Sequence, residues 1–275
     1  MNIKKLTLNL IVISSLLTGY SICSSSVRTY REEMIAENLR AEALMVSPTL
    51  LKVISGEFKG LWADYLQLKA SIFLGGYSKS TAEDWEVVYL LFKQSLALDP
   101  WFFQTCYYTQ GILAWQKTMS ERAIELLKIS AEHRYWDWEP RFYIGFDYFY
   151  FLKENLMAAK YLSVAAKLPG APPIVATLGA RLAQKAGQTE TAIAILRIML
   201  DRTDNEALKL RLEKRIKVHL GMLIIERSIA IYAQKYGKSP ASLNELIDKG
   251  IIDQLPENPY VETYTYENGH VGMGF

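Results

Sequence analysis

Three histidines and two carboxylates are the residues of this chain that suggest acid–base or metal chemistry. His133, His219 and His270 are scattered, and none belongs to an HExxH motif or to the spacing of a catalytic triad. Glu57 and Asp64 are near one another in the sequence, but no nucleophile or metal motif accompanies them. We expect Glu57 and Asp64 to be exposed or salt-bridged, and we expect that the protein is not an enzyme. A cryptic active site is a remaining alternative, and it predicts that Asp64→Ala abolishes activity without lowering thermal stability.

The composition gives little support for a cofactor, a metal or a nucleic acid. Cys23 and Cys106 are the only cysteines, so the chain has no CxxC pair and no disulfide framework. The segment GGYSKS, residues 75–80, lacks the spacing of a phosphate-binding loop and predicts a turn. The formal net charge is +2, whereas nucleic-acid binders usually carry a strongly basic face. We expect no cofactor, no metal ion and no nucleic-acid partner.

The segment RFYIGFDYFYF, residues 141–151, contains seven aromatic residues in eleven. On a helix, Ile144 and Tyr148 share a face with Gly145, and four of the other rings form a single stripe on another face at helical spacing. Two interpretations of this stripe stay open: the chain covers it with its own N-terminal helices or C-terminal segment, or it binds an apolar helix of a partner. The stripe consists of Phe142, Phe146, Phe149 and Tyr150.

Small residues recur along the middle of the chain. Gly111, Gly145 and Gly179 are equally spaced, and each lies inside an apolar helical pattern. Small side chains let two helical backbones approach closely. An alanine opens a second apolar pattern about a dozen residues after each glycine; these are Ala123, Ala158 and Ala192.

This order of small and aromatic residues resembles the tetratricopeptide repeat family over about residues 85–203. The resemblance implies stacked helix–turn–helix units of about 34 residues each, which matches the glycine interval. Two features depart from the family pattern, because one alanine interval is a residue longer than the glycine interval and the usual turn glycine is missing except near Gly187. The predicted fold is all-α: a TPR-like α-solenoid of helical hairpins with an N-terminal signal anchor and a small α+β C-terminal tail.

The resemblance also implies a concave groove that binds a partner. The groove has none of the paired Lys, Arg and Asn residues that clamp a terminal carboxylate, so we expect an apolar or aromatic helix as its occupant. In the third helix–turn–helix repeat the corresponding groove residues are the small Ala176, Ala180 and Ala183. The expected groove residues are Tyr108, Ile112, Trp115, Phe142, Phe146, Phe149 and Tyr150.

Residues 1–24 have the pattern of a targeting segment. Lys4 and Lys5 precede an uncharged run, residues 6–23, of about eighteen residues, near the minimum that spans a bilayer. Three outcomes stay open: retention as an anchor, cleavage near Cys23, or lipidation of Cys23. The positive-inside rule keeps Lys4 and Lys5 on the cytoplasmic side. It therefore predicts that the rest of the chain lies outside the cytoplasm, on the periplasmic face of the inner membrane.

The regions on either side of the repeats have different patterns. Residues 25–84 predict capping helices, and residues 204–237 predict one long packing helix that ends at Gly237. Residues 238–275 predict a short helix, a proline-flanked loop and a hairpin that turns at Asn268-Gly269. This last segment resembles the C-terminal part of type II secretion major pseudopilins. Residues 6–23 lack the processed glycine and buried glutamate of that family, so we do not expect the chain to polymerise.

These observations predict a non-enzymatic scaffold of the cell envelope that binds another envelope or membrane protein through the aromatic groove. The first alternative is an assembly factor of a secretion or pilus-like machine that acts through residues 238–275. The second is the enzyme with a cryptic site.

Overall fold

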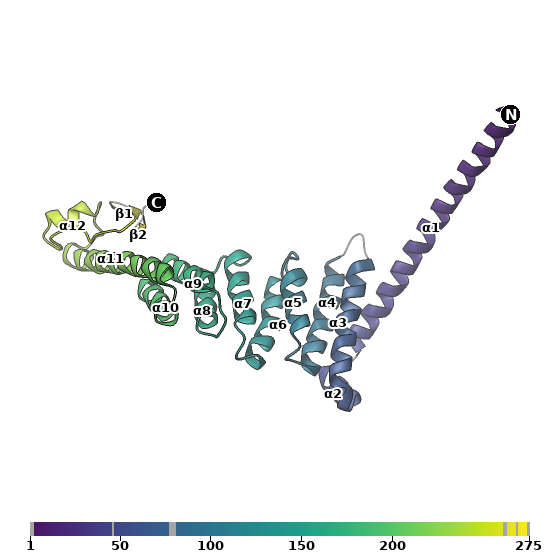
Figure 1. The fold of residues 1–275 in the computed structure, drawn as a ribbon, viewed down its shortest axis with the longest axis horizontal. Coiled ribbons are helices and arrows are strands. Elements are labelled where there is room, and N and C mark those ends of the chain that lie inside the picture. Colours follow the sequence, from purple (N-terminus) through teal and green to yellow (C-terminus); the bar gives the residue numbers. More distant parts are fainter. Residues whose placement is uncertain (1–2, 46, 77–80, 261–262, 268, 274–275) are drawn as a thin grey trace. The chain divides into compact units, whose positions relative to one another are not determined.

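A computed structural model describes residues 3–45, 47–76, 81–260, 263–267 and 269–273 of the chain. Its described part is mostly helical and ends in a small two-stranded sheet (Figure 1). The chain divides into two compact units, residues 1–130 and 131–275, and this division falls inside the stretch predicted as repeats. Helix α6 (Ser120–His133) crosses the division.

The first unit packs its helices around α4. A capping box starts α4, because Thr81 accepts a hydrogen bond from the Asp84 amide while the Asp84 carboxylate accepts one from the Thr81 amide. Helices α1, α2 and α3 pack on α4. The buried Ser95 hydroxyl joins three helices, since it donates to the Ala63 carbonyl at 3.0 Å and lies 2.9 Å from the Thr105 hydroxyl. The elements are α1 (Ile3–Met45), α2 (Pro48–Ser55), η1 (Gly56–Phe58), α3 (Lys59–Gly76), α4 (Ala82–Leu98), α5 (Phe103–Tyr108) and the π-helix η2 (Thr109–Leu113).

In the part of the chain whose side chains are described, no helix is long and apolar enough to cross a membrane. Residues 6–10 of the predicted anchor lie outside that part.

Each helix of the second unit packs on the next along the chain, from α7 to α11. Figure 1 shows these helices in chain order, with α8 beside α9. Proline lies in the first turn of α7 and of α9, where its missing N–H costs no intrahelical hydrogen bond. The helices are α7 (Glu139–Tyr150), α8 (Asn155–Ala165), α9 (Pro173–Lys185), α10 (Thr189–Arg202), α11 (Glu206–Tyr236) and α12 (Asn244–Asp248).

The long helix α11 confirms the prediction from sequence. The Asn205 side chain caps its first turn by accepting from the Leu208 amide at 3.0 Å. Gly237 ends it with a φ of 71°, a left-handed conformation that glycine adopts without steric cost.

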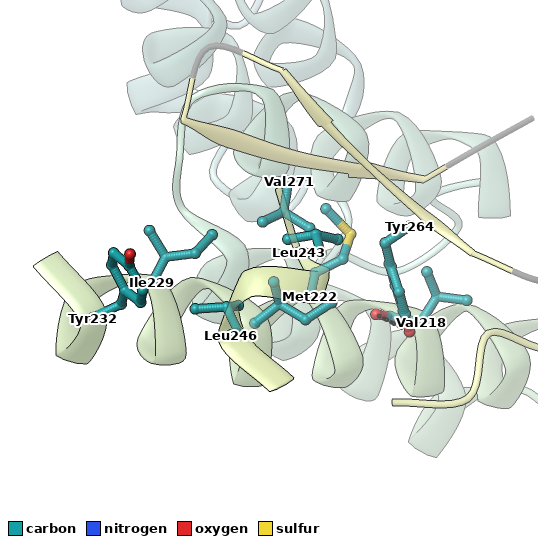
Figure 2. Close-up of a cluster of buried hydrophobic side chains, with 9 residues drawn as sticks. Val218, Met222, Ile229, Tyr232, Leu243, Leu246, Tyr264 and Val271 are labelled. Carbon is teal, nitrogen blue, oxygen red and sulfur yellow. Dashed lines mark hydrogen bonds between the residues drawn. The ribbon is translucent and has the colours of Figure 1, made fainter. Parts of the chain in front are cut away.

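The C-terminal segment folds back on α11. As predicted, strands β1 (Tyr264–Glu267) and β2 (His270–Met273) form an antiparallel hairpin. The Tyr232 hydroxyl on α11 donates to the Glu245 carboxylate on α12 at 2.5 Å, and this bond raises the pKa of Tyr232 to about 12. Figure 2 shows the apolar cluster between α11, α12 and the hairpin. Its members are Val218, Met222, Ile225, Ile229, Tyr232, Leu243, Leu246, Tyr264 and Val271.

Candidate interaction surface

Helix α7 carries a continuous row of aromatic rings, which we call the α7 aromatic row. Trp138 and Phe142 are in contact with ring centroids 5.7 Å apart, and Phe142 lies 6.4 Å from Phe146. Phe146 stacks on Tyr150 at 5.4 Å with an angle of 10° between the ring planes. Phe151 closes the row, with its ring 6.3 Å from that of Phe146 and 5.0 Å from that of Tyr150. Helical spacing places Phe142, Phe146 and Tyr150 along one side of α7, and Trp138 and Phe151, which flank the helix, extend the row through ring contacts.

The row is partly open to solvent. Tyr150 is 44% exposed, while Phe142, Phe146 and the neighbouring Phe149 are half-buried. The rings bury part of their area against one another, and each keeps some surface available for a further contact. Four of the seven predicted groove residues thus gather on one side of α7.

The opposite face of α7 holds the row in position. Ile144 and Tyr148 are buried there together with Gly145, as the sequence predicted. The Tyr148 ring stacks on Tyr161 of α8 at 5.7 Å. A Cβ atom added to Gly145 would lie 2.7 Å from Cγ of Leu162, so α7 and α8 approach as closely as a glycine permits.

A half-buried arginine fixes the start of α7. The Arg141 guanidinium donates to the backbone carbonyls of Ala131, Arg134 and Asp137 at 2.6 to 3.1 Å. Asp137 also pairs with Arg134 at 2.7 Å. One carbonyl in the last turn of α6 and two in the loop after it are thereby bonded to the helix that carries the aromatic row.

The other predicted repeat-packing residues differ in their surroundings. Ala123, Ala158 and Ala192 are fully buried, and Gly179 packs on Leu162 from the α9 side. Gly111 corrects the prediction, because it is exposed and an added Cβ would meet no atom within 4 Å. It lies in the π-helix η2, where the regular α-helical spacing does not hold, and the buried small residue next to this segment is Ala114.

The third set of predicted groove positions is also corrected. Ala176, Ala180 and Ala183 are buried in the packing of α9 and do not line an open surface. Their small side chains let α9 lie close to the helices on both sides.

In the first unit, the remaining groove residues lie on α5, on η2 and just after it. Tyr108 and Ile112 are half-buried, and Trp115 is 51% exposed. A groove that unites these three with the α7 aromatic row stays a prediction.

The first unit also has an apolar pocket that the sequence did not reveal. Its volume is about 610 Å³, and it lies between α2, α3 and α4. Leu61 and Tyr65 follow a helical spacing, but the pocket also needs walls from α2 and α4, which only the tertiary structure supplies. The lining includes Leu51, Leu61, Trp62, Tyr65, Lys69 and Gln94.

The two carboxylates and three histidines that suggest chemistry lie on five different elements. Glu57 and Asp64 are both exposed, on η1 and α3. His133 ends α6, His219 is buried in α11 and His270 starts β2. Within the described residues, no group of His, Cys, Asp and Glu side chains is arranged to hold a metal ion.

No protein-family model, curated protein or solved structure matches the chain.

Proposed function

We propose that this chain is a non-enzymatic scaffold of the cell envelope that binds a helix of another envelope or membrane protein. The observation that supports this proposal is the α7 aromatic row, a partly exposed line of rings on a helix whose opposite face is fixed against α8. Helix-binding surfaces commonly use apolar anchors presented by a rigid element.

The chemistry of the row favours an apolar or aromatic partner. Burial of apolar area contributes roughly 25 cal/mol per Å². Aromatic side chains offer a large contact area with few rotatable bonds, so little conformational entropy is lost when they bind. In the first unit, Tyr108 on α5 and the exposed Trp115 in the turn after η2 carry rings of the same chemistry.

The proposal includes the architecture and the location expected from the sequence. The helix pairs between about residues 85 and 203 act as a TPR-like α-solenoid, and residues 6–23 act as the anchor that holds the scaffold on the periplasmic face of the inner membrane. The packing of each helix on the next from α7 to α10 supports the repeat architecture, and Gly145 and Gly179 both lie at close helix contacts, against Leu162 of α8.

A pair of matched variants tests this function. Phe146→Asp places a charge in the middle of the row, whereas Ile231→Asp places the same charge on α11, where Ile231 is 53% exposed. Full-length protein is recovered from membranes by affinity capture, and the recovered partner is quantified for each variant beside its melting temperature. We expect Phe146→Asp to lose the partner and Ile231→Asp to retain it, both at near wild-type melting temperature. If the melting temperature falls strongly for Phe146→Asp and not for Ile231→Asp, the α7 aromatic row is part of the hydrophobic core and the proposal is wrong.

The C-terminal segment favours a second function, that of an assembly factor for a secretion or pilus-like machine. It packs on α11 through its own buried cluster, while Thr265 and Glu267 on the hairpin face solvent. Removal of residues 238–275 would expose the apolar face of α11, so substitution at the surface is the cleaner test. Thr265→Lys combined with Glu267→Lys should abolish partner recovery if the tail binds, and should leave it unchanged if the α7 aromatic row binds.

A further inference from the structure

A second cavity lies in the second unit, separate from the α7 aromatic row. Its volume is about 580 Å³, within the range of about 300–1,000 Å³ typical of small-ligand sites. The first turns of α9 form one wall, the N-terminal part of α11 forms another, and Tyr260 of the tail contributes the remainder. The Tyr260 hydroxyl donates to the Arg211 carbonyl at 3.4 Å, which ties the tail to α11 beside the cavity.

The polar part of this cavity is basic. Arg211 and Arg215 are one helical turn apart on α11, and neither guanidinium has an ion-pair or hydrogen-bond partner among the described residues. Asn205 already uses its Oδ1 to cap α11, which leaves its side-chain N–H groups as donors. The described lining contains no carboxylate. The cavity therefore offers donors and positive charge without an internal counter-ion.

The other part of the cavity is apolar. Ile174 projects from the first turn of α9 and is 64% exposed, and Pro173 lies beside it. Leu208 and Leu212 contribute from α11. An apolar wall beside two unpaired guanidinium groups suits a carboxylate attached to an apolar group better than it suits a bare inorganic anion.

We propose that this cavity binds a carboxylate that is joined to a short apolar group. Arg211 and Arg215 hold the carboxylate, and Ile174, Leu208 and Leu212 contact the apolar part. Two sources share this chemistry: the end of a polypeptide with an apolar last residue, and a small organic acid.

Binding of defined probes to the full-length protein in lipid nanodiscs tests the proposal. The first probe is an acetylated Ala-Ala-Leu peptide with a free carboxylate, titrated by calorimetry beside the same peptide as its C-terminal amide. We expect saturable binding of the acid and at least about tenfold weaker binding of the amide, because a charge-assisted hydrogen bond is lost. If hexanoate competes as well as the peptide, the natural ligand is a small organic acid. If hexanoate does not compete, the ligand is the C-terminal end of a polypeptide.

Three variants connect binding to the named residues. Arg211→Gln combined with Arg215→Gln should weaken binding at least about tenfold, and Ile174→Asp should do so through the apolar wall. Arg227→Gln is the matched control, because Arg227 is paired with Glu190 at 2.7 Å and does not line the cavity. The proposal is overturned if the acid does not bind, if the amide or inorganic phosphate binds equally well, or if Arg227→Gln weakens binding as much as the double variant.

Discussion

The Cβ atom that Gly145 lacks would lie 2.7 Å from Cγ of Leu162, and the one that Gly179 lacks would lie 3.1 Å from Cβ of the same leucine. One buried side chain on α8 thus contacts the helices on both sides at glycine positions, and the contact is tighter at Gly145 than at Gly179. The regular recurrence of glycine along the chain has a direct packing reason at two of its three positions.

Alanine at Gly145 should lower the free energy of unfolding, because the added methyl group overlaps Leu162. Overpacking costs about 1–3 kcal/mol, which exceeds the gain of at most about 1 kcal/mol that alanine brings to a helix interior. Gly111→Ala is the matched control and should be stabilising by about 0.5–1 kcal/mol, since its Cβ meets no atom. Urea denaturation of each variant measures the difference.

A double variant separates this clash from other causes. Leu162→Ala removes the atoms that Gly145→Ala would overlap, so the cost of the glycine change should shrink or vanish in that background. Equal costs of Gly145→Ala with and without Leu162 would show that another contact is responsible.

Alanine at Gly221 should displace the C-terminal hairpin. A Cβ atom at Gly221 would overlap the hydroxyl oxygen of Tyr264, which is buried against α11. We expect faster hydrogen exchange of the β1 and β2 amides in Gly221→Ala, because the hairpin has to lift from α11. Tyr264→Phe removes the overlapping atom, so the double variant should recover part of the protection. Unchanged exchange in Gly221→Ala would contradict this packing.

His219 should make stability depend on pH. Burial lowers the pKa of its imidazole, while its Nδ1 is hydrogen-bonded to the Arg215 carbonyl at 2.9 Å. The folded state therefore prefers the neutral ring, whereas the unfolded chain binds a proton near a pKa of about 6.5. The stabilisation is fully present above that value and is lost as the pH falls through the lower pKa of the folded state.

The pH dependence can be isolated with His219→Gln. The melting temperature of the wild type should fall more steeply between about pH 7 and pH 5 than that of the variant, because only the wild type gains a proton at this site on unfolding. Identical slopes for the two proteins would show that His219 does not contribute.

The sequence predicted best where one local signal determines the structure. Gly237 marks the end of α11, and Gly269 marks the start of β2 with a φ of 83°, because few residues other than glycine adopt these left-handed backbone conformations. The spacing of Phe142, Phe146 and Tyr150 also predicted their shared side of α7 correctly. The same spacing extends one turn earlier to Trp138, which sequence reasoning missed although the signal was available.

The remaining features depend on information that a single sequence does not carry. A residue count assumes a regular helix, and this assumption fails in the π-helix at residues 109–113, where Gly111 is exposed and packs on no neighbour. The cavity beside Arg211 and Arg215 needs walls from α9, α11 and the tail, segments that only tertiary packing brings together.

Photo-crosslinking from the α7 aromatic row is the most direct test of the scaffold function. A benzoylphenylalanine replaces Tyr150, which is 44% exposed, or Ile231 as the control site on α11, and cells that carry the full-length protein are irradiated. The account predicts one discrete crosslinked envelope protein from position 150 and none from position 231. Crosslinks from position 150 that join only two parts of the same chain would show that the chain covers its own aromatic row, and would contradict the proposed function.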